Sequence, residues 1–151
     1  FPVKHKELTL IPFATDELIV AMNPSHPLAT KDSLSIEELK GVDFIAFERD
    51  IPTRKATDQI LRNAEEDVSI VMEFDNVETV KRALEINAGV AIIPKNTIAN
   101  ETDRKQLITC RLDNGSHIRP LSLIHKKTRM LTPALRSFIE TMQNSPTSKV
   151  E

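Results

Sequence analysis

Residues 74–94 constrain the fold more than any other stretch of the sequence. Asp75 and Asn76 are both suited to begin a helix, because a short side-chain oxygen can accept an unpaired backbone N–H. Glu78 follows Asp75 at the spacing of a capping box. The apolar residues that come next recur at helical intervals: Val77, Val80 and Leu84. The pattern predicts a helix with a defined start.

A buried strand is expected directly after this helix. Asn87 or Gly89 can take the left-handed conformation that ends a helix. Residues 90–93 are wholly apolar, which suits a strand covered on both faces, and Pro94 ends the run. Residues 74–94 therefore predict the second half of a βαβ crossover.

The rest of the chain continues this alternation. Strands are predicted at residues 8–12 (ending at Pro12), 18–22, 42–47, 68–74, 107–112 and 118–125, the last broken early by Pro120. Helices are predicted at 35–41, where Ser35 and Glu38 form a capping box, at 52–64, at 95–100, and from Pro133, with Thr132 as its cap. Residues 15–17 form a polar break, and 113–115 a turn. From 42 to 94 strands and helices alternate, which predicts a parallel sheet with right-handed crossovers.

The helix predicted from Pro133 carries an apolar stripe that is expected to be buried. The stripe consists of Leu135, Phe138, Ile139 and Met142. Residues 144–151 are polar and are expected to form a frayed tail.

Composition excludes several classes of function. The net charge of −2 creates no field that would draw the chain to nucleic acid or to an anionic membrane. No apolar run is long enough to span a bilayer. The absence of Trp and Tyr argues against an aromatic platform for bases or sugars. The single cysteine, Cys110, permits no internal disulfide and favours a reducing compartment.

Neither a metal centre nor a catalytic centre is expected. The histidines show no metal-ligand spacing with one another or with Cys110: His5, His26, His117 and His125. Cys110 lies in an apolar run typical of an inert, buried thiol. Three glycines leave little material for a phosphate-binding loop, and no Ser–His–Asp or Cys–His arrangement stands in a persuasive order. We therefore expect no cofactor, no metal and no enzymatic activity.

Four stretches together resemble one protein family. Residues 76–94 are similar to the late-domain signature of LysR-type transcriptional regulators, bacterial proteins with an N-terminal winged helix-turn-helix and a C-terminal effector-binding domain. Residues 16–29 resemble the family's hinge strand and its His-Pro-Leu-Ala turn, 35–41 its next short helix, and 131–142 its closing helix. These stretches occur in the family's order and span nearly the whole chain.

The resemblance implies an α/β fold of the periplasmic-binding-protein type II kind, with one complete lobe and part of the other. Residues 1–17 would be a remnant of the first lobe and the hinge, and 18–112 the second lobe. Residues 113–143 would be the returning hinge strand and the closing helix of the first lobe, and 144–151 a flexible tail. Because the opening part of the family's domain has no counterpart here, we expect the chain to be a fragment of a longer protein.

The candidate effector site lies where strands run into helices. Ligands of open α/β sheets bind beyond the carboxyl ends of the strands, and helix N-termini there attract anions. The helices near Pro52 and after Asn76 are expected to begin at one rim, with Arg54 adding a fork of donors. The expected lining residues, also favoured by the resemblance, are Arg49, Ile51, Pro52, Thr53 and Asn76. Alternatively, Thr53 and Asn76 merely satisfy their own helices.

Thr15 falls at the hinge that the resemblance implies, and its hydroxyl is a further candidate for contact with the effector. The neighbouring Asp16 is instead expected to pair with Lys126 or Arg119 across the hinge strands.

The favoured hypothesis is the effector-binding portion of a bacterial regulator that senses a small, anionic metabolite between two lobes. The resemblance implies self-association of the full-length protein as a dimer or tetramer, DNA contact only through the missing N-terminal domain, no membrane partner, and a cytoplasmic location. The alternative is a solute-binding receptor of the same fold that serves a transporter. An enzyme on this fold is disfavoured by the lack of a catalytic arrangement.

Overall fold

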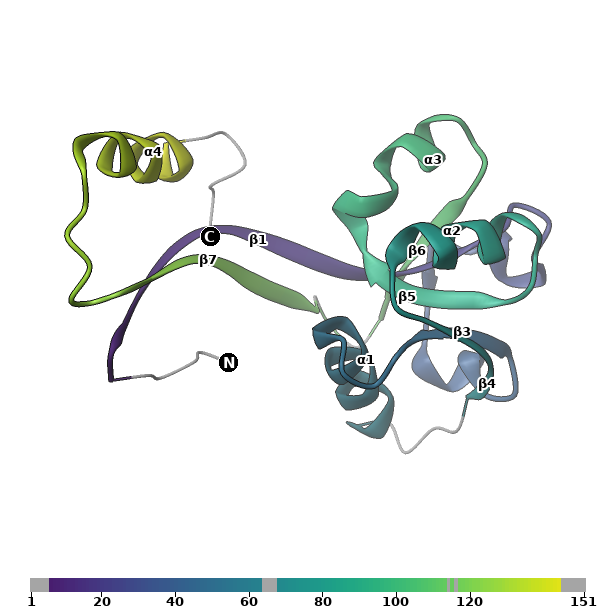
Figure 1. The fold of residues 1–151 in the computed structure, drawn as a ribbon. Helices are drawn as coiled ribbons and strands as arrows, with labels where there is room; N and C mark the ends of the chain where they lie inside the picture. Colours follow the sequence, from purple (N-terminus) through teal and green to yellow (C-terminus); the bar gives the residue numbers. More distant parts are fainter. Residues whose placement is uncertain (1–5, 64–67, 114, 116, 145–151) are drawn as a thin grey trace. The chain divides into compact units, whose positions relative to one another are not determined.

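The computed structural model describes residues 6–63, 68–113, 115 and 117–144 (Figure 1). The chain divides into two compact units. Unit 1 comprises the residues up to Asp16 together with those from Ile118 onward, and unit 2 runs from Glu17 to His117. The division falls between Asp16 and Glu17, inside the first strand, β1 Leu8–Met22, so this strand contributes to both units.

Unit 2 is built on a mixed sheet with the strand order β2-β6-β1-β5-β3-β4. The strands are β1 Leu8–Met22, β2 Ser33–Leu34, β3 Asp43–Phe47, β4 Ser69–Phe74, β5 Val90–Pro94 and β6 Ile108–Leu112. The helices of this unit are α1 Pro52–Asn63, α2 Val77–Glu85 and α3 Ala99–Asp103, with short 3-10 helices η1 Pro27–Thr30, η2 Ile36–Leu39 and η3 Lys95–Ile98.

The centre of this sheet is the predicted parallel arrangement. β3 pairs in parallel with both β4 and β5, and helices α1 and α2 make the two crossovers. β1 runs antiparallel to β5 and to β6, so the sheet as a whole is mixed. The predicted crossover at residues 74–94 is confirmed as β4-α2-β5, with Asn87 and Gly89 both at positive φ after the helix.

The cap of α2 differs from one of the predictions. Asn76 is the N-cap, and its side-chain oxygen accepts a hydrogen bond from the backbone N–H of Thr79. The capping box expected between Asp75 and Glu78 is wrong, because Asp75 lies one residue before the cap and the Glu78 carboxylate pairs with Lys81. The second expected capping box, between Ser35 and Glu38, is present at η2.

Side chains of the central strands alternate between two hydrophobic cores, one on each face of the sheet. In β1, Leu18, Val20 and Met22 join the core that includes Ile60 and Leu61 of α1. Ile19 and Ala21 join the opposite core, which includes three residues of α2: Val80, Ala83 and Leu84. The two crossover helices therefore cover opposite faces, and continuous apolar runs such as β5 are buried on both sides.

Unit 1 contains the beginning of β1, strand β7 Ile118–Lys126 and helix α4 Pro133–Gln143. β7 pairs with β1: the Lys127 N–H donates to the Glu7 carbonyl at 2.8 Å, and the Leu18 N–H to the His117 carbonyl at 2.9 Å. These bonds lie at opposite ends of β7 and join its end to the beginning of β1, so the two strands are antiparallel. α4 begins as predicted, with the Thr132 hydroxyl accepting from the Leu135 N–H.

Three sequence predictions are wrong in this unit. The first strand does not stop at Pro12 or break at residues 15–17, and Pro120 does not interrupt β7. Both prolines are exposed, and a proline is tolerated where a strand edge needs no N–H donor. The polar residues remain in the strand because β7 provides partners, including Arg119 for Asp16.

The apolar stripe of α4 is not buried as expected. No residue of α4 is buried, and Phe138 is 51% exposed. Within the described residues, unit 1 offers this helix only two strands, which is too little surface to cover it. The predicted turn at 113–115 includes Asn114, and the predicted tail continues through 145–151; those residues lie outside the described part of the chain.

Candidate functional site

The carboxyl ends of β3 and β4 meet at one rim of the sheet in unit 2. Phe47 and Phe74 are in register at the ends of the two strands, and the Glu48 N–H donates to the Phe74 carbonyl at 2.9 Å. Helices α1 and α2 begin within a few residues of this bond. The prediction that both helices start at the same rim is confirmed. We call residues 48–53 and 74–76 the rim.

The start of α1 carries no polar capping side chain at its boundary residue. The Lys55 N–H donates to the Ile51 carbonyl at 3.3 Å, so the first helical turn closes on Ile51. The aliphatic side chain of Ile51 cannot accept a hydrogen bond from the N–H groups of this turn. Pro52 follows, exposed in the first turn, where its missing N–H is harmless. The backbone N–H groups and the positive end of the helix dipole make this start suited to an anion.

The start of α2 is different, because its own side chains occupy it. The Asn76 side-chain oxygen accepts from the Thr79 N–H at 2.9 Å and from the Thr79 hydroxyl at 3.0 Å. The Asn76 amide donates to the Asp75 carboxylate at 2.7 Å. These contacts agree with the alternative interpretation of Asn76, in which it satisfies its own helix.

Arg54 holds the rim together instead of offering a fork of donors to a ligand. Its guanidinium donates to the Phe47 carbonyl at 2.7 Å, to the Asp58 carboxylate at 2.7 Å, and to the Glu73 carboxylate. Burial alone would lower the pKa of Arg54, but the hydrogen bonds to Glu73 and Asp58 outweigh it and raise the pKa. The side chain thus joins β3, β4 and α1 as a permanent cation, a role that sequence spacing could not reveal because Glu73 is distant in the chain.

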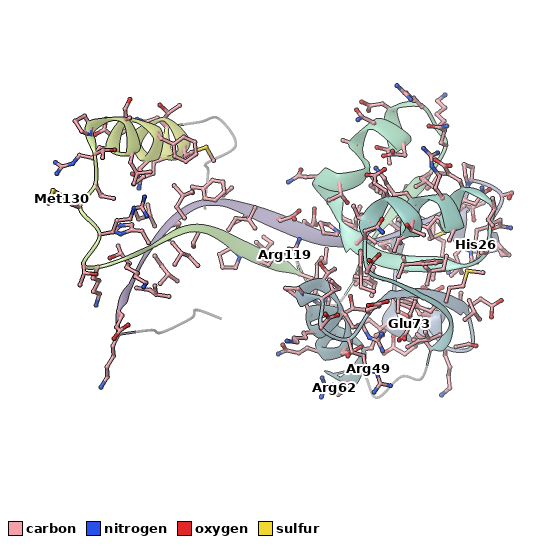
Figure 2. The ribbon with its side chains drawn as sticks, viewed as in Figure 1. His26, Arg49, Arg62, Glu73, Arg119 and Met130 are labelled. Atoms are coloured by element: carbon pink, nitrogen blue, oxygen red, sulfur yellow. The ribbon has the colours of Figure 1, made fainter. Side chains whose placement is uncertain are left out.

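The other rim candidates have unlike environments. Arg49, labelled in Figure 2, is exposed. With Arg54 and four residues of β4, it lines a surface cavity of about 400 Å3. Thr53 is buried, at 7% exposure, and Ile51 is half-buried. Within unit 2 the structure brings together Arg49, Ile51, Pro52, Thr53 and Asn76, whereas Thr15 belongs to unit 1.

At the end of unit 1, Thr15 and Asp16 are consecutive residues of β1, so their side chains point to opposite faces of the strand. Arg119 of β7 donates to the Asp16 carboxylate at 3.0 Å. The predicted pairing of Asp16 across the two strands is confirmed, and Arg119 is the partner.

The described residues were also compared with the requirements of a metal site, a reactive thiol and a membrane-spanning helix. No group of three or more His, Cys, Asp or Glu side chains in that part of the chain could hold a metal ion. Cys110 is buried in β6, where burial, together with the negative charge of Asp32, raises the pKa of its thiol and so disfavours the nucleophilic thiolate. No helix among these residues is long and apolar enough to cross a membrane.

The mixed sheet with its crossover helices has the periplasmic-binding-protein type II-like fold, which the chain shares with the solved structures described below. The family model described as the LysR substrate binding domain matches residues 1–146. The chain belongs to this family.

Named relatives support the same assignment. A "Probable RuBisCO transcriptional regulator" of Cyanophora paradoxa is 33% identical over 139 residues, covering 90% of this chain and 43% of the relative. A protein of the same name from Synechocystis sp. is 30% identical over 138 residues, covering 89% of this chain and 40% of the relative. The chain thus spans less than half the length of these relatives.

Solved structures show the same fold. The regulatory domain of CcmR from Synechocystis PCC6803, in complex with 2-PG, has a TM-score of 0.87 at 23% identity and covers 99% of this chain and 71% of that one. The effector binding domain of QuiR, in complex with shikimate, has a TM-score of 0.81 at 18% identity and covers 95% of this chain and 67% of that one.

Proposed function

We propose that the chain is the effector-binding part of a transcriptional regulator and that it binds a small anionic metabolite. The family match over residues 1–146 carries this proposal, and the names of the relatives favour a regulator over a receptor for a transporter. The start of α1 supplies the physical basis, since the N–H groups of a first helical turn and the positive end of the helix dipole favour a negative charge. Arg49, Ile51, Pro52, Thr53, Asn76 and Thr15 are the proposed contacts.

The regulatory step requires that the effector bind one arrangement of the protein more tightly than another. We propose that the effector acts on a winged helix-turn-helix elsewhere in the protein, which makes the DNA contact, and that the protein works in the cytoplasm without catalysing a reaction. A ligand with equal affinity for both arrangements would change nothing, however tightly it bound.

A thermal-shift screen of the intact protein tests the proposal. The panel is 2-phosphoglycolate, 2-phosphoglycerate, shikimate and inorganic phosphate, because neighbours of the same fold are described with 2-PG and shikimate. A true effector raises the melting temperature progressively with concentration. At a hundredfold excess over Kd, it adds about 2.7 kcal/mol to the free energy of unfolding. If neither these compounds nor a broader set of metabolite anions stabilises the protein, the proposal fails.

Thr53→Val removes one proposed contact while preserving the shape of the side chain. We expect the affinity for a hit from the screen to fall at least about tenfold, as for the loss of one hydrogen bond to a charged ligand. The matched control is Thr57→Val on the next turn of α1, because Thr57 is also buried and its hydroxyl has no hydrogen-bond partner among the described residues. Calorimetric titration showing equal affinities for wild type and Thr53→Val would remove Thr53 from the site.

We also propose a surface for self-association along β4. This strand lies at the end of the sheet, and its consecutive residues Ile70, Val71 and Met72 are 42%, 44% and 38% exposed. The pairing with β3 shifts register between Phe44 and Ile45, so Val71 is the extra residue of a bulge. A bulge hinders the addition of a strand at this edge, so a second copy would dock through these apolar side chains instead.

Val71→Glu and Met72→Glu should each weaken self-association of the intact protein by at least about tenfold, because each buries an unpaired carboxylate in the contact. Ile86→Glu is the control, since Ile86 is a single exposed apolar residue at the C-cap of α2. Sedimentation velocity over a concentration series measures the effect. An unchanged association constant in both β4 variants would place the contact elsewhere.

A further inference from the structure

The edge of the sheet opposite the rim brings three segments of unit 2 together. β3 and β5 are parallel, so their first residues lie at the same edge, where Phe44 is in register with Val90. β1 runs antiparallel to β5, with Met22 opposite Val90, so β1 ends at this edge. The turn after β1, the start of β3 and the residues between α2 and β5 therefore meet on the side of the sheet away from the rim.

Two contacts fix these segments relative to one another. The side-chain amide of Asn23 donates to the Glu85 carbonyl at 2.7 Å and so joins the turn after β1 to the end of α2. Gly89 approaches the start of β3 so closely that an added β-carbon would lie 2.4 Å from the Asp43 carbonyl oxygen. The segments are therefore arranged before any ligand binds, which lowers the free-energy cost of binding.

A cavity of about 440 Å3 is lined by residues of all three segments, within the range of about 300–1,000 Å3 that small-molecule sites occupy. Each segment supplies one polar side chain: His26 (labelled in Figure 2), Asp43 and Asn87. The apolar part of the lining is Pro27, Leu28, Val42 and Ala88. A few polar groups beside an apolar wall are the usual composition of a small-molecule site.

The three polar side chains can all bond to a ligand. The Leu28 N–H donates to Nδ1 of His26 at 3.3 Å, so the proton of the neutral ring lies on Nε2, for which the described residues supply no acceptor. Partial burial lowers the pKa of His26, which favours the neutral ring. Asp43 and Asn87 are exposed, and within the described part of the chain neither side chain takes part in a hydrogen bond or an ion pair. The cavity thus presents one carboxylate together with N–H donors from an imidazole and an amide.

We propose that this cavity binds a free amino acid with an apolar side chain. The Asp43 carboxylate accepts from its ammonium group, and the His26 ring and the Asn87 amide donate to its carboxylate. The apolar wall covers its side chain. Because the cavity and the rim lie at opposite ends of β3, this site is separate from the proposed effector site and does not depend on it.

Thermal-shift titration of the intact protein with L-alanine, L-valine, L-leucine and L-methionine tests the proposal, and calorimetry then gives the Kd of the amino acid with the largest shift. The N-acetyl derivative of that amino acid lacks the ammonium group, and its amide derivative lacks the carboxylate. Each derivative should bind at least about tenfold more weakly than the free amino acid. Failure of all four amino acids to bind, or equal binding of the N-acetyl derivative, would overturn the inference and leave the proposed function untouched.

Variants then test whether the amino acid occupies this cavity. Asp43→Asn keeps the shape of the side chain but removes its charge, and it should weaken binding at least about tenfold. His26→Asn keeps an acceptor for the Leu28 N–H, since asparagine is a good N-cap, but removes the ring donor, so we expect a loss of similar size.

Asp103→Asn is the matched control, because Asp103 is exposed in the same unit, lies outside the cavity and makes no ion pair with any described residue. This control should bind the amino acid as wild type does, and so should Thr53→Val at the rim. Equal affinities for Asp43→Asn and Asp103→Asn would overturn the inference. A loss in Thr53→Val as large as that in Asp43→Asn would also overturn it, because the amino acid would then bind at the rim.

Discussion

Gly89→Ala should destabilise the protein by about 3 kcal/mol or more, because the substitution combines backbone strain with a steric clash. Gly89 precedes β5 with a φ of +151°, a conformation that residues with a side chain rarely adopt. A β-carbon built at this position would lie 2.4 Å from the Asp43 carbonyl oxygen and 2.9 Å from the Asp43 carbonyl carbon. Both atoms belong to the backbone where β3 begins, so neither can move without displacing a central strand.

Gly41→Ala separates the two contributions. Gly41 also has a positive φ, +69°, but a β-carbon there would meet no atom within 4 Å. This change should cost only about 1 kcal/mol, the strain of a left-handed residue. Thermal unfolding of the two variants beside wild type measures the difference, and Gly89→Ala should lower the melting temperature by about 10 °C or more. Equal losses for the two variants would show that the strands yield and that the close approach is unimportant.

The parts of the fold that sequence predicted well are those with dense local signals. Residues 74–94 carry a cap, a helical stripe, left-handed residues and an apolar run, and all of them describe the observed β4-α2-β5 crossover except for the role given to Asp75. The common rim followed from topology alone, since the ends of neighbouring parallel strands must lie together. In these places local preference and tertiary packing favour the same structure.

The predictions failed where distant residues decide. Pro12 and the polar residues 15–17 look like breaks, yet β7, more than a hundred residues later, pairs with this segment and keeps it in one strand. Arg54 looked like an anion-binding fork, but Glu73 and the Phe47 carbonyl occupy its donors. The stripe of α4 has the pattern of a buried face, but burial also needs a covering surface, which a pattern within one helix cannot supply.

Lys81→Met should cost about 3 kcal/mol at neutral pH, because it removes the buried cation of an ionic cluster. Lys81 of α2 is 7% exposed, and its ammonium lies 2.7 Å from the Glu78 carboxylate and 2.9 Å from the Glu101 carboxylate, with a further hydrogen bond to the Thr97 carbonyl at 3.3 Å. Burial lowers the pKa of Lys81, and the hydrogen bonds to both carboxylates outweigh it, so the pKa is raised. Methionine fills the same volume but leaves the poorly exposed Glu101 without its cation.

The cost of this substitution should shrink as the pH falls. The hydrogen bond from Lys81 lowers the pKa of Glu101 against the opposing effect of burial. A carboxylate whose pKa is lower in the folded state stabilises the protein above its unfolded pKa of about 4.5, and this contribution disappears as the pH drops through the folded pKa. Chemical denaturation at several pH values should therefore show the largest difference between wild type and Lys81→Met near neutrality and a smaller one below pH of about 4. Arg82→Met, on the next residue of α2, removes an exposed pair with Glu85 and only the smallest of the effects that lower the pKa of Glu101, so it should show a much smaller loss and a much weaker pH dependence. If Lys81→Met matches Arg82→Met at neutral pH, the cluster contributes no more to stability than a surface ion pair does.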